Sequence, residues 1–236
     1  MRTVAVVLAA GSGSRFGSTG PKQLRLLAGR NLIEHCVQAF DDAPGVDQVL
    51  VVTAADLQEQ IRRDLSGVAK VAAVIQGGAT RTDSTRRALA WLTNAPPDAK
   101  VLFHDAARPL VDQRIIADCV AALDRWQAIS VVVPSSDTIV EIADGTIERV
   151  LPRHTLARCQ TPQGFRLSVI TRAYERADCD PAFATTPATD DCGVVLRYLP
   201  DVTIGAVSGS ERNLKITYAD DLAIARALVG PANDGG

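Results

Sequence analysis

The chain has 236 residues, of which 47% are hydrophobic and 22% charged, with a formal net charge of −2 at pH 7. This length and apolar content suffice for a full hydrophobic core. The near-neutral charge, without a basic stripe, argues against nucleic-acid binding, and no apolar run approaches the roughly 18 residues that span a membrane. Because the first apolar run begins at Thr3, we expect no targeting segment and a cytoplasmic location.

The cysteines and histidines form no recognisable metal or redox motif. The five cysteines are Cys36, Cys119, Cys159, Cys179 and Cys192. They are odd in number and widely spaced, without a Cys-x-x-Cys pair, so the pattern favours neither a disulfide framework nor structural zinc. The three histidines form no pair at helical spacing, and no motif around a cysteine marks it as a nucleophile.

The first element expected in chain order is a strand over Val4–Leu8, because an unbroken apolar run is typical of a strand buried on both faces. A glycine-rich loop with Gly11, Gly13 and Arg15 follows it, and Lys22 comes shortly after. Such a loop at the carboxyl end of a parallel strand places backbone N–H groups where they can hold phosphates. With two added cations, the segment predicts a triphosphate site.

Three other interpretations of this loop stay open at this point. A dinucleotide-binding fingerprint would need a glycine where Phe16 stands, and no convincing acidic residue ends the second strand. A P-loop would need Gly-Lys-Ser/Thr, whereas Lys22 lies between Pro21 and Gln23. A plain glycine-rich turn with solvated cations is the third, because such loops are weak signals by themselves. The loop therefore needs support from other parts of the chain.

Apolar runs alternate with segments of helical spacing, which predicts repeated βα units. After the first strand, the expected helices are 31–40, 57–64, 81–93, 114–126 and 219–228. The expected strands are 48–52, 70–76, 101–104, 129–133 and 202–207. The predicted fold class is α/β, with a mainly parallel, Rossmann-like sheet flanked by helices. We expect a single domain over residues 1–229 and a disordered tail over 230–236.

The segment 135–158 breaks this alternation and predicts a protruding β-hairpin arm. Two alternating runs, 138–142 and 146–150, flank Asp144-Gly145, and Asp-Gly between such runs is a strong hairpin signal. A lone hairpin is marginally stable in water, so it needs a surface to pack on. A second copy of the chain is one candidate surface, and the sheet of the same chain is the other.

A second glycine pair follows the third strand, at the edge where open α/β sheets bind ligands. Gly77 and Gly78 could press backbone against a flat base. The alternative is an ordinary helix start that is capped by Thr82 or Asp83.

Two charged positions complete the set of candidates. Asp105 follows the fourth strand and could hold Mg²⁺ on a nucleotide, because magnesium there takes few protein carboxylates. A structural pair between Asp105 and Arg108 is the alternative. Lys215 lies before the last helix and is a candidate cation for a second, phosphorylated substrate.

Together these motifs resemble the 2-C-methyl-D-erythritol 4-phosphate cytidylyltransferase family of the non-mevalonate isoprenoid pathway. The resemblance runs from residue 3 to about residue 228 and rests on the order and spacing of short motifs. The matching residues are Ala9, Ala10, Gly11, Gly13, Arg15, Pro21, Lys22, Gly77, Gly78, Arg81, Ser84, His104 to Pro109, Asp137, Thr138, Gln160 to Gln163, Thr189, Asp190 and Lys215 to Thr217.

The resemblance implies a nucleotidyltransferase that converts CTP and 2-C-methyl-D-erythritol 4-phosphate to 4-diphosphocytidyl-2-C-methyl-D-erythritol and pyrophosphate, with Mg²⁺ or another divalent cation. The implied catalytic residues are Arg15, Lys22, Arg153 and Lys215. The implied nucleotide-binding residues are Ala9, Ala10, Gly11, Gly13, Gly78, Asp83 and Ser84. The implied acceptor-binding residues are Asp105, Arg108, Thr138, Arg153, Thr161, Thr189 and Lys215, with Asp105 also the metal ligand.

The resemblance also implies a homodimer whose hairpin arm reaches the partner's active site, so that Thr138 and Arg153 act across the interface. The chain departs from the family pattern here. The family commonly carries a basic pair one residue after the Asp-Thr motif, whereas Val140 and Glu141 stand at those positions. In this respect the chain is similar to ribitol-5-phosphate cytidylyltransferases, and ribitol 5-phosphate or another polyol phosphate is the alternative acceptor.

Two alternatives come from other functional classes. A non-catalytic CTP-binding protein would keep the fold without the chemistry, but Arg15, Lys22 and Asp105 form a full set of charged residues. An NAD-dependent dehydrogenase is disfavoured by the displaced glycine pattern.

Overall fold

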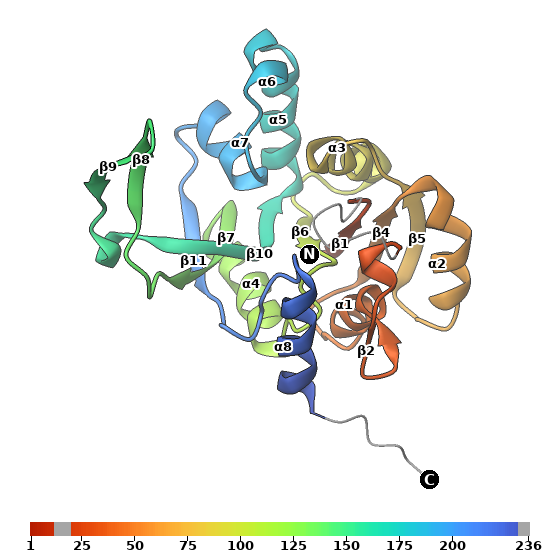
Figure 1. Ribbon diagram of the computed structural model, residues 1–236. Coiled ribbons are helices and arrows are strands. Elements are labelled where there is room, and N and C mark those ends of the chain that lie inside the picture. The colour runs from red at the N-terminus through yellow and green to blue at the C-terminus, as the bar shows by residue number, and fades with distance from the viewer. Residues whose placement is uncertain (12–19, 231–236) are drawn as a thin grey trace.

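The computed structural model describes residues 1–11 and 20–230 and is built around a seven-stranded sheet (Figure 1). The strands lie in the order β11-β7-β10-β6-β1-β4-β5. Their bounds are β1 Thr3–Ala9, β4 Gln48–Thr53, β5 Val71–Gln76, β6 Lys100–Asp105, β7 Ala128–Pro134, β10 Ala157–Arg166 and β11 Ile204–Ser208. Every neighbouring pair is parallel except the two that β10 makes, with β6 and with β7. The predicted α/β class with a mainly parallel sheet is confirmed.

The helices cover both faces of this sheet. Their bounds are α1 Leu32–Asp41, α2 Gln58–Asp64, α3 Arg81–Trp91, α4 Gln113–Arg125, α5 Leu167–Asp178, α6 Pro181–Thr185, α7 Asp191–Tyr198 and α8 Ala219–Val229. Apolar residues of α1, α2 and α4 form one buried core against the sheet. Those of α3, α5 and α7 form a second core on the opposite face. The molecule therefore has three layers, with the sheet in the middle (Figure 1).

Strand β1 lies between these two cores. Its residues Ala5, Val7 and Ala9 contribute to one core, and the alternate residues Val4, Val6 and Leu8 to the other. All seven of its residues are buried. Successive side chains of a strand point to opposite faces, so a strand covered on both sides must be apolar throughout. This accounts for the unbroken apolar run from which the strand is predicted.

The order of the strands reverses beside β1. From β1 the chain passes through α1 to β4 and through α2 to β5 on one side, and then through α3 to β6 on the other side of β1. The helices α1 and α3 consequently lie on opposite faces of the sheet. Ligands of open α/β sheets bind at such a switch point, beyond the carboxyl ends of the strands.

The predicted helices and strands are present, with ends that differ by one or two residues from those expected; the helix predicted over 81–93 continues from α3 into a 3-10 turn, Leu92–Asn94. The structure adds β10, α5, α6 and α7 between the arm and the last strand, where the sequence analysis proposes no element. A small antiparallel pair, β2 (Leu26–Leu27) and β3 (Arg30–Asn31), lies before α1. Of these additions, β10 is the antiparallel strand of the main sheet, between β7 and β6.

The predicted hairpin is confirmed as β8 (Val140–Ala143) and β9 (Thr146–Val150). Asp144 and Gly145 both have positive φ, 49° and 80°, as the two-residue turn requires. The hairpin extends away from the layered body at the left of Figure 1. The predicted arm segment, 135–158, ends too late: Ala157 and Arg158 already pair with β7 as part of β10.

Two further expectations concern the ends of the chain and membranes. The predicted tail lies outside the described residues from residue 231 onward. No helix among residues 1–11 and 20–230 has the length and hydropathy that a membrane span needs.

Candidate active site

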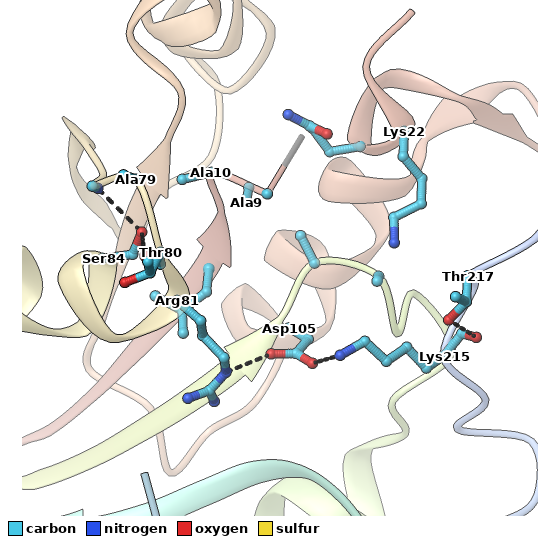
Figure 2. A pocket seen from close by; sticks show the side chains of 16 residues that line it. Ala9, Ala10, Lys22, Ala79, Thr80, Arg81, Ser84, Asp105, Lys215 and Thr217 are labelled. Atoms are coloured by element: carbon cyan, nitrogen blue, oxygen red, sulfur yellow. Dashed lines mark hydrogen bonds and ion pairs between the residues drawn. The ribbon is translucent and has the colours of Figure 1, made fainter. Parts of the chain in front are cut away.

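A pocket of about 320 Å³ lies at the switch point between β1 and β6 (Figure 2). Its wall comes from five segments of the chain: 8–11, 22–23, 78–84, 105–107 and 215–217. The lining residues are Leu8, Ala9, Ala10, Gly11, Lys22, Gln23, Gly78, Ala79, Thr80, Arg81, Ser84, Asp105, Ala106, Ala107, Lys215 and Thr217. The loop after β1 therefore faces the loop after β5, the loop after β6 and the segment before α8.

The glycine pair after β5 is required by close packing. A Cβ atom on Gly77 would lie 2.5 Å from the Cβ of Ala10 and 2.8 Å from Oγ of Ser84. One on Gly78 would lie 2.1 Å from the Cβ of Asp83. The two glycines thus let the loop after β1 touch the start of α3, and they give that wall of the pocket an unobstructed backbone.

The start of α3 corrects one expectation, since the helix is capped by Thr80 and not by Thr82 or Asp83. The hydroxyl of Thr80 accepts a hydrogen bond from the backbone N–H of Asp83 at 3.0 Å, and the Asp83 carboxylate accepts from the Thr80 backbone N–H at 3.2 Å. This reciprocal capping box satisfies two N–H groups that lack partners inside the helix. Asp83 does not line the pocket, because its carboxylate faces Thr80 and Arg86.

Lys22 reaches the pocket from a short helical turn, Lys22–Leu24, after the glycine-rich loop. Its Nζ donates a hydrogen bond to the backbone carbonyl of Ile216 at 2.8 Å. Ile216 is fully buried against Leu27, Leu32 and α8. The contact therefore ties the Lys22 side chain to the segment that carries Lys215.

Asp105 is the centre of the charge arrangement. Its Oδ1 lies 3.3 Å from Nε of Arg81, and its Oδ2 lies 2.7 Å from Nζ of Lys215. Figure 2 shows the two cations approaching the carboxylate from opposite sides. Burial raises the pKa of the Asp105 carboxyl, but the neighbouring cations outweigh it and hold the pKa well below its usual range. Asp105 is therefore an anion at neutral pH.

Behind Asp105, a buried hydrogen-bond chain joins β6 to β10. Nε2 of His104 lies 3.0 Å from the carbonyl oxygen of Arg108, which can only accept, so Nε2 carries the ring proton. Burial lowers the pKa of His104 to about 4, so the ring is neutral and its Nδ1 accepts from the Thr161 hydroxyl at 3.1 Å. Thr161 Oγ1 in turn accepts from the backbone N–H of Asp105 at 3.1 Å. The chain fixes the end of β6.

Arg108 is only 8% exposed and does not pair directly with Asp105, so that alternative is wrong. Its guanidinium donates to the carbonyl oxygens of Asn213 at 2.8 Å and of Cys159 at 3.3 Å. The buried Asn213 side chain also donates to the Thr161 carbonyl at 2.9 Å. These bonds hold the segment before α8 against β10.

The sixteen candidate residues divide into four groups. Those that line the pocket are Ala9, Ala10, Gly11, Lys22, Gly78, Ser84, Asp105 and Lys215. Those buried beside it or at its edge without lining it are Arg108, Thr161 and Asp83. Those exposed and away from its lining are Thr138, Arg153 and Thr189. Gly13 and Arg15 lie outside the described residues.

The structure adds Arg81 as a pocket residue to which the sequence analysis gives no role. Its Nη1 lies 2.6 Å from Oδ2 of Asp191, whose side chain is fully buried. A partner 110 residues away leaves no local sequence signal. The position of Arg81, three residues after the glycine pair and at the first residue of α3, is the signal that could have found it.

Among the described residues, no group of three or more His, Cys, Asp or Glu side chains could hold a metal ion. Asp105 is the one acidic residue in the described lining of the pocket. Any metal bound here would therefore need oxygen ligands from a substrate.

Comparison with known proteins identifies the family. The family model of 2-C-methyl-D-erythritol 4-phosphate cytidylyltransferase matches residues 3–231. The chain is 48% identical to the protein of that name from Thermobifida fusca, over 97% of this chain and 93% of that protein. It is 36% identical to the bifunctional ribulose 5-phosphate reductase/CDP-ribitol pyrophosphorylase Bcs1 from Haemophilus influenzae, over 96% of this chain and 48% of that protein.

A solved structure gives the same result. The 4-diphosphocytidyl-2C-methyl-D-erythritol synthase from Anaerococcus prevotii matches with a TM-score of 0.82 and 25% identity, over 97% of this chain and 98% of that one. Sequence, fold and the motifs around the pocket agree over nearly the whole length. The chain belongs to the 2-C-methyl-D-erythritol 4-phosphate cytidylyltransferase family.

Proposed function

We propose that the chain transfers the cytidylyl group of CTP to 2-C-methyl-D-erythritol 4-phosphate, a step of isoprenoid precursor biosynthesis in the cytoplasm. The observation that carries this proposal is the pocket at the switch point, where open backbone at Gly11 and Gly78 lies opposite Lys22 and Lys215. Such a wall suits a nucleoside triphosphate, because backbone N–H groups and cations both bind phosphate. Family membership supplies the identity of the base and of the acceptor.

In the proposed reaction, a phosphate oxygen of the acceptor attacks the α-phosphorus of CTP in line. The bond from that phosphorus to the bridging oxygen breaks, and pyrophosphate leaves with the electron pair. Positioning and charge stabilisation account for most of the catalysis in such transfers. Lys22 and Arg15 would stabilise the negative charge that develops on the triphosphate.

The small side chains on one wall suit the flat cytosine ring. Ala9, Ala10 and Gly78 offer little obstruction, and Ser84 supplies a buried hydroxyl beside them. That hydroxyl accepts from the Gly78 N–H at 3.2 Å. Asp83 would act on the base only indirectly, through the capped start of α3.

The donor set fits Mg²⁺ bound to a nucleotide, because that ion takes few protein carboxylates and completes its shell with phosphate oxygens and water. Asp105 would be its protein ligand, and the ion when bound would neutralise charge on the triphosphate. Lys215 occupies Oδ2 of Asp105 and has a side chain that is 43% exposed. It can therefore turn from the carboxylate toward the phosphate of an arriving acceptor.

The acceptor half would be completed by a second copy of the chain. Thr138 and Arg153 lie on the arm and are exposed, and the apolar residues Ile142, Ile147 and Val150 of the hairpin are more than 60% exposed. An exposed apolar hairpin is marginal alone and gains stability by packing. We propose a homodimer in which each arm delivers Thr138 and Arg153 to the partner's pocket, next to Thr189 and Lys215.

Turnover with pure acceptors tests this function. We expect pyrophosphate release from CTP and Mg²⁺ with 2-C-methyl-D-erythritol 4-phosphate, and a kcat/KM for ribitol 5-phosphate that is lower. The second candidate, a polyol-phosphate cytidylyltransferase, rests on Val140 and Glu141 in place of a basic pair and on the Bcs1 relative. A kcat/KM ratio in favour of ribitol 5-phosphate would select that candidate, and CTP binding without turnover would indicate a non-catalytic protein.

A further inference from the structure

An ion-pair chain runs from the core to the pocket. Asp191 contacts Arg81 at 2.6 Å, Arg81 contacts Asp105 at 3.3 Å, and Asp105 contacts Lys215 at 2.7 Å. The charges alternate along the chain. Arg81, Asp105 and Lys215 belong to the described lining of the pocket, and Asp191 does not.

The Asp191 carboxylate is held from several sides. Its Oδ1 accepts from the hydroxyl of Tyr174 at 2.7 Å and from that of Thr85 at 3.0 Å. Its backbone N–H donates to Oε1 of Gln163 at 3.2 Å, which fixes the start of α7 to β10. Oδ2 is thereby left to Arg81. A carboxylate with this many contacts has one orientation, and it presents one oxygen to one guanidinium.

Burying a carboxylate at this position is a poor way to stabilise the fold. The desolvation cost of a buried ion pair often exceeds its attraction, and well-packed apolar residues commonly do as well. Cys192 and Val195, on the same helix as Asp191, belong to the apolar core on this face of the sheet. A buried ion pair that apolar residues could replace without loss of stability points to a role in positioning.

The guanidinium of Arg81 is what Asp191 would position. Arg81 uses Nη1 on Asp191 and Nε on Asp105, so the planar fork is fixed at two of its three nitrogens. The third, Nη2, is buried and has no hydrogen-bond partner within residues 1–11 and 20–230. The guanidinium is therefore held between Asp191 on one side and Asp105 on the other.

We propose that Asp191 is a positioning residue of the reaction: it holds the Arg81 guanidinium against Asp105 and so sets the charge geometry between the triphosphate and the acceptor phosphate. This inference rests on the proposed cytidylyl transfer. The Asp191–Arg81 contact joins α3, at the proposed nucleotide site, to the segment 189–191, which contains the candidate acceptor residue Thr189. Asp191 touches no substrate and acts only through Arg81.

The kinetic test uses Asp191→Asn, which keeps the shape and removes the charge. We expect kcat to fall roughly 10- to 100-fold, because small misplacements of charged groups cost that much, while KM for CTP changes less than about threefold. Asp178→Asn is the matched control, since it makes the same change at an exposed aspartate of α5. Asp178 pairs with Arg86, which lies on α3 as Arg81 does. The kcat of Asp178→Asn should equal that of the wild type. A kcat of Asp191→Asn equal to that of the control would overturn the inference.

A cycle with Arg81 separates positioning from folding. In the Arg81→Gln background, Asp191→Asn should cause no further loss of kcat, because the residue it acts through is gone. The shift in melting temperature that Asp191→Asn causes should have opposite signs in the two backgrounds. The substitution should lower the melting temperature of the wild type and raise that of Arg81→Gln, where Asp191 is a buried anion without its cation. Equal shifts in both backgrounds would contradict the pairing.

The melting temperatures need no substrate, so they are independent of the proposed function. Absence of turnover in the wild type would refute the proposed function. Normal turnover in the wild type, with additive effects of Asp191→Asn and Arg81→Gln, would refute this inference alone. If Asp191→Asn does not fold, Arg81→Lys serves instead, because it keeps the charge but cannot contact both carboxylates. It should lower kcat with little change in KM, and an unchanged kcat would contradict the inference.

Discussion

The two halves of the proposed active site differ in how far one chain builds them. The nucleotide half is assembled within the chain, from the ends of β1, β5 and β6, and its polar groups are held by capping, close packing and ion pairs. The acceptor half is not: Thr138, Arg153 and Thr189 are exposed and none lines the pocket. The difference supports the proposal that CTP binds a site one chain forms, whereas the acceptor site is completed by a second copy.

The largest effect is expected in the nucleotide half. Lys22→Ala should lower kcat about 10²- to 10³-fold, the usual cost of losing one group that stabilises transition-state charge. Lys70→Ala is a matched control, because Lys70 Nζ also donates to a backbone carbonyl, that of Ala43, but lies outside the pocket. The measurement is pyrophosphate release. Equal rates in the two variants would remove Lys22 from the catalytic residues.

The next largest effect separates the halves. Arg153→Ala should raise KM for the acceptor about 10-fold or more, as expected for loss of a charge-assisted phosphate contact, and leave the affinity for CTP unchanged. Arg149→Ala is the control on the same arm, where Arg149 pairs with Glu141. Binding of CTP by calorimetry and initial rates against acceptor concentration give both quantities. A loss of CTP binding in Arg153→Ala would place this residue in the wrong half.

A smaller effect tests the packing of the preformed half. Gly77→Ala should lower the free energy of unfolding by about 1–3 kcal/mol, as overpacking does, and weaken CTP binding because the added methyl group meets Ala10 and Ser84. Gly67→Ala is the control, since a Cβ there meets nothing within 4 Å. Denaturant unfolding and calorimetry measure the two effects. Identical behaviour of both variants would show that the contact between the loops is not needed.

The smallest effect is read from the thiols. Burial raises the pKa of the Cys36, Cys119 and Cys192 thiols, so alkylation at pH 8 should modify only the exposed Cys159 and Cys179. Cys159 lies beside Arg108 on the acceptor side. Acceptor should therefore slow labelling of Cys159 and leave that of Cys179 unchanged, as peptide mass spectrometry can show. Equal slowing of both thiols would argue against an acceptor site there.

Much of the fold could be predicted because its parallel strands are apolar throughout and its helices have a regular period. Strand β10 could not, because Gln160, Thr161 and Gln163 are buried polar residues and Pro162 is unusual inside a sheet. A register shift between Cys159 and Gln163 and side-chain hydrogen bonds accommodate them. Helix α5 carries a detectable signal in the helical spacing of Ile170, Ala173, Tyr174 and Ala177.

The candidate site divides in the same way. Residues at strand ends, such as Ala10, Gly78 and Asp105, could be placed from the sequence because parallel strands bring their carboxyl ends together. The hydrogen bond between the Thr161 hydroxyl and His104 could not be predicted, since it joins residues 57 positions apart. The pairing of Arg81 with Asp191 depends likewise on the position of α7, which local patterns do not give.

Mixing two impaired variants tests the division between the halves most directly, when the acceptor is kept well below KM so that both Lys22→Ala and Arg153→Ala are slow. In a heterodimer of Lys22→Ala and Arg153→Ala subunits, an arm that crosses the interface restores one intact site and leaves the other doubly defective. Random mixing yields about half heterodimers, so the account predicts recovery of about one quarter of the wild-type activity. Activity no higher than the mean of the two separate variants, with heterodimers confirmed by mass, would contradict the claim that the partner's arm completes the acceptor half.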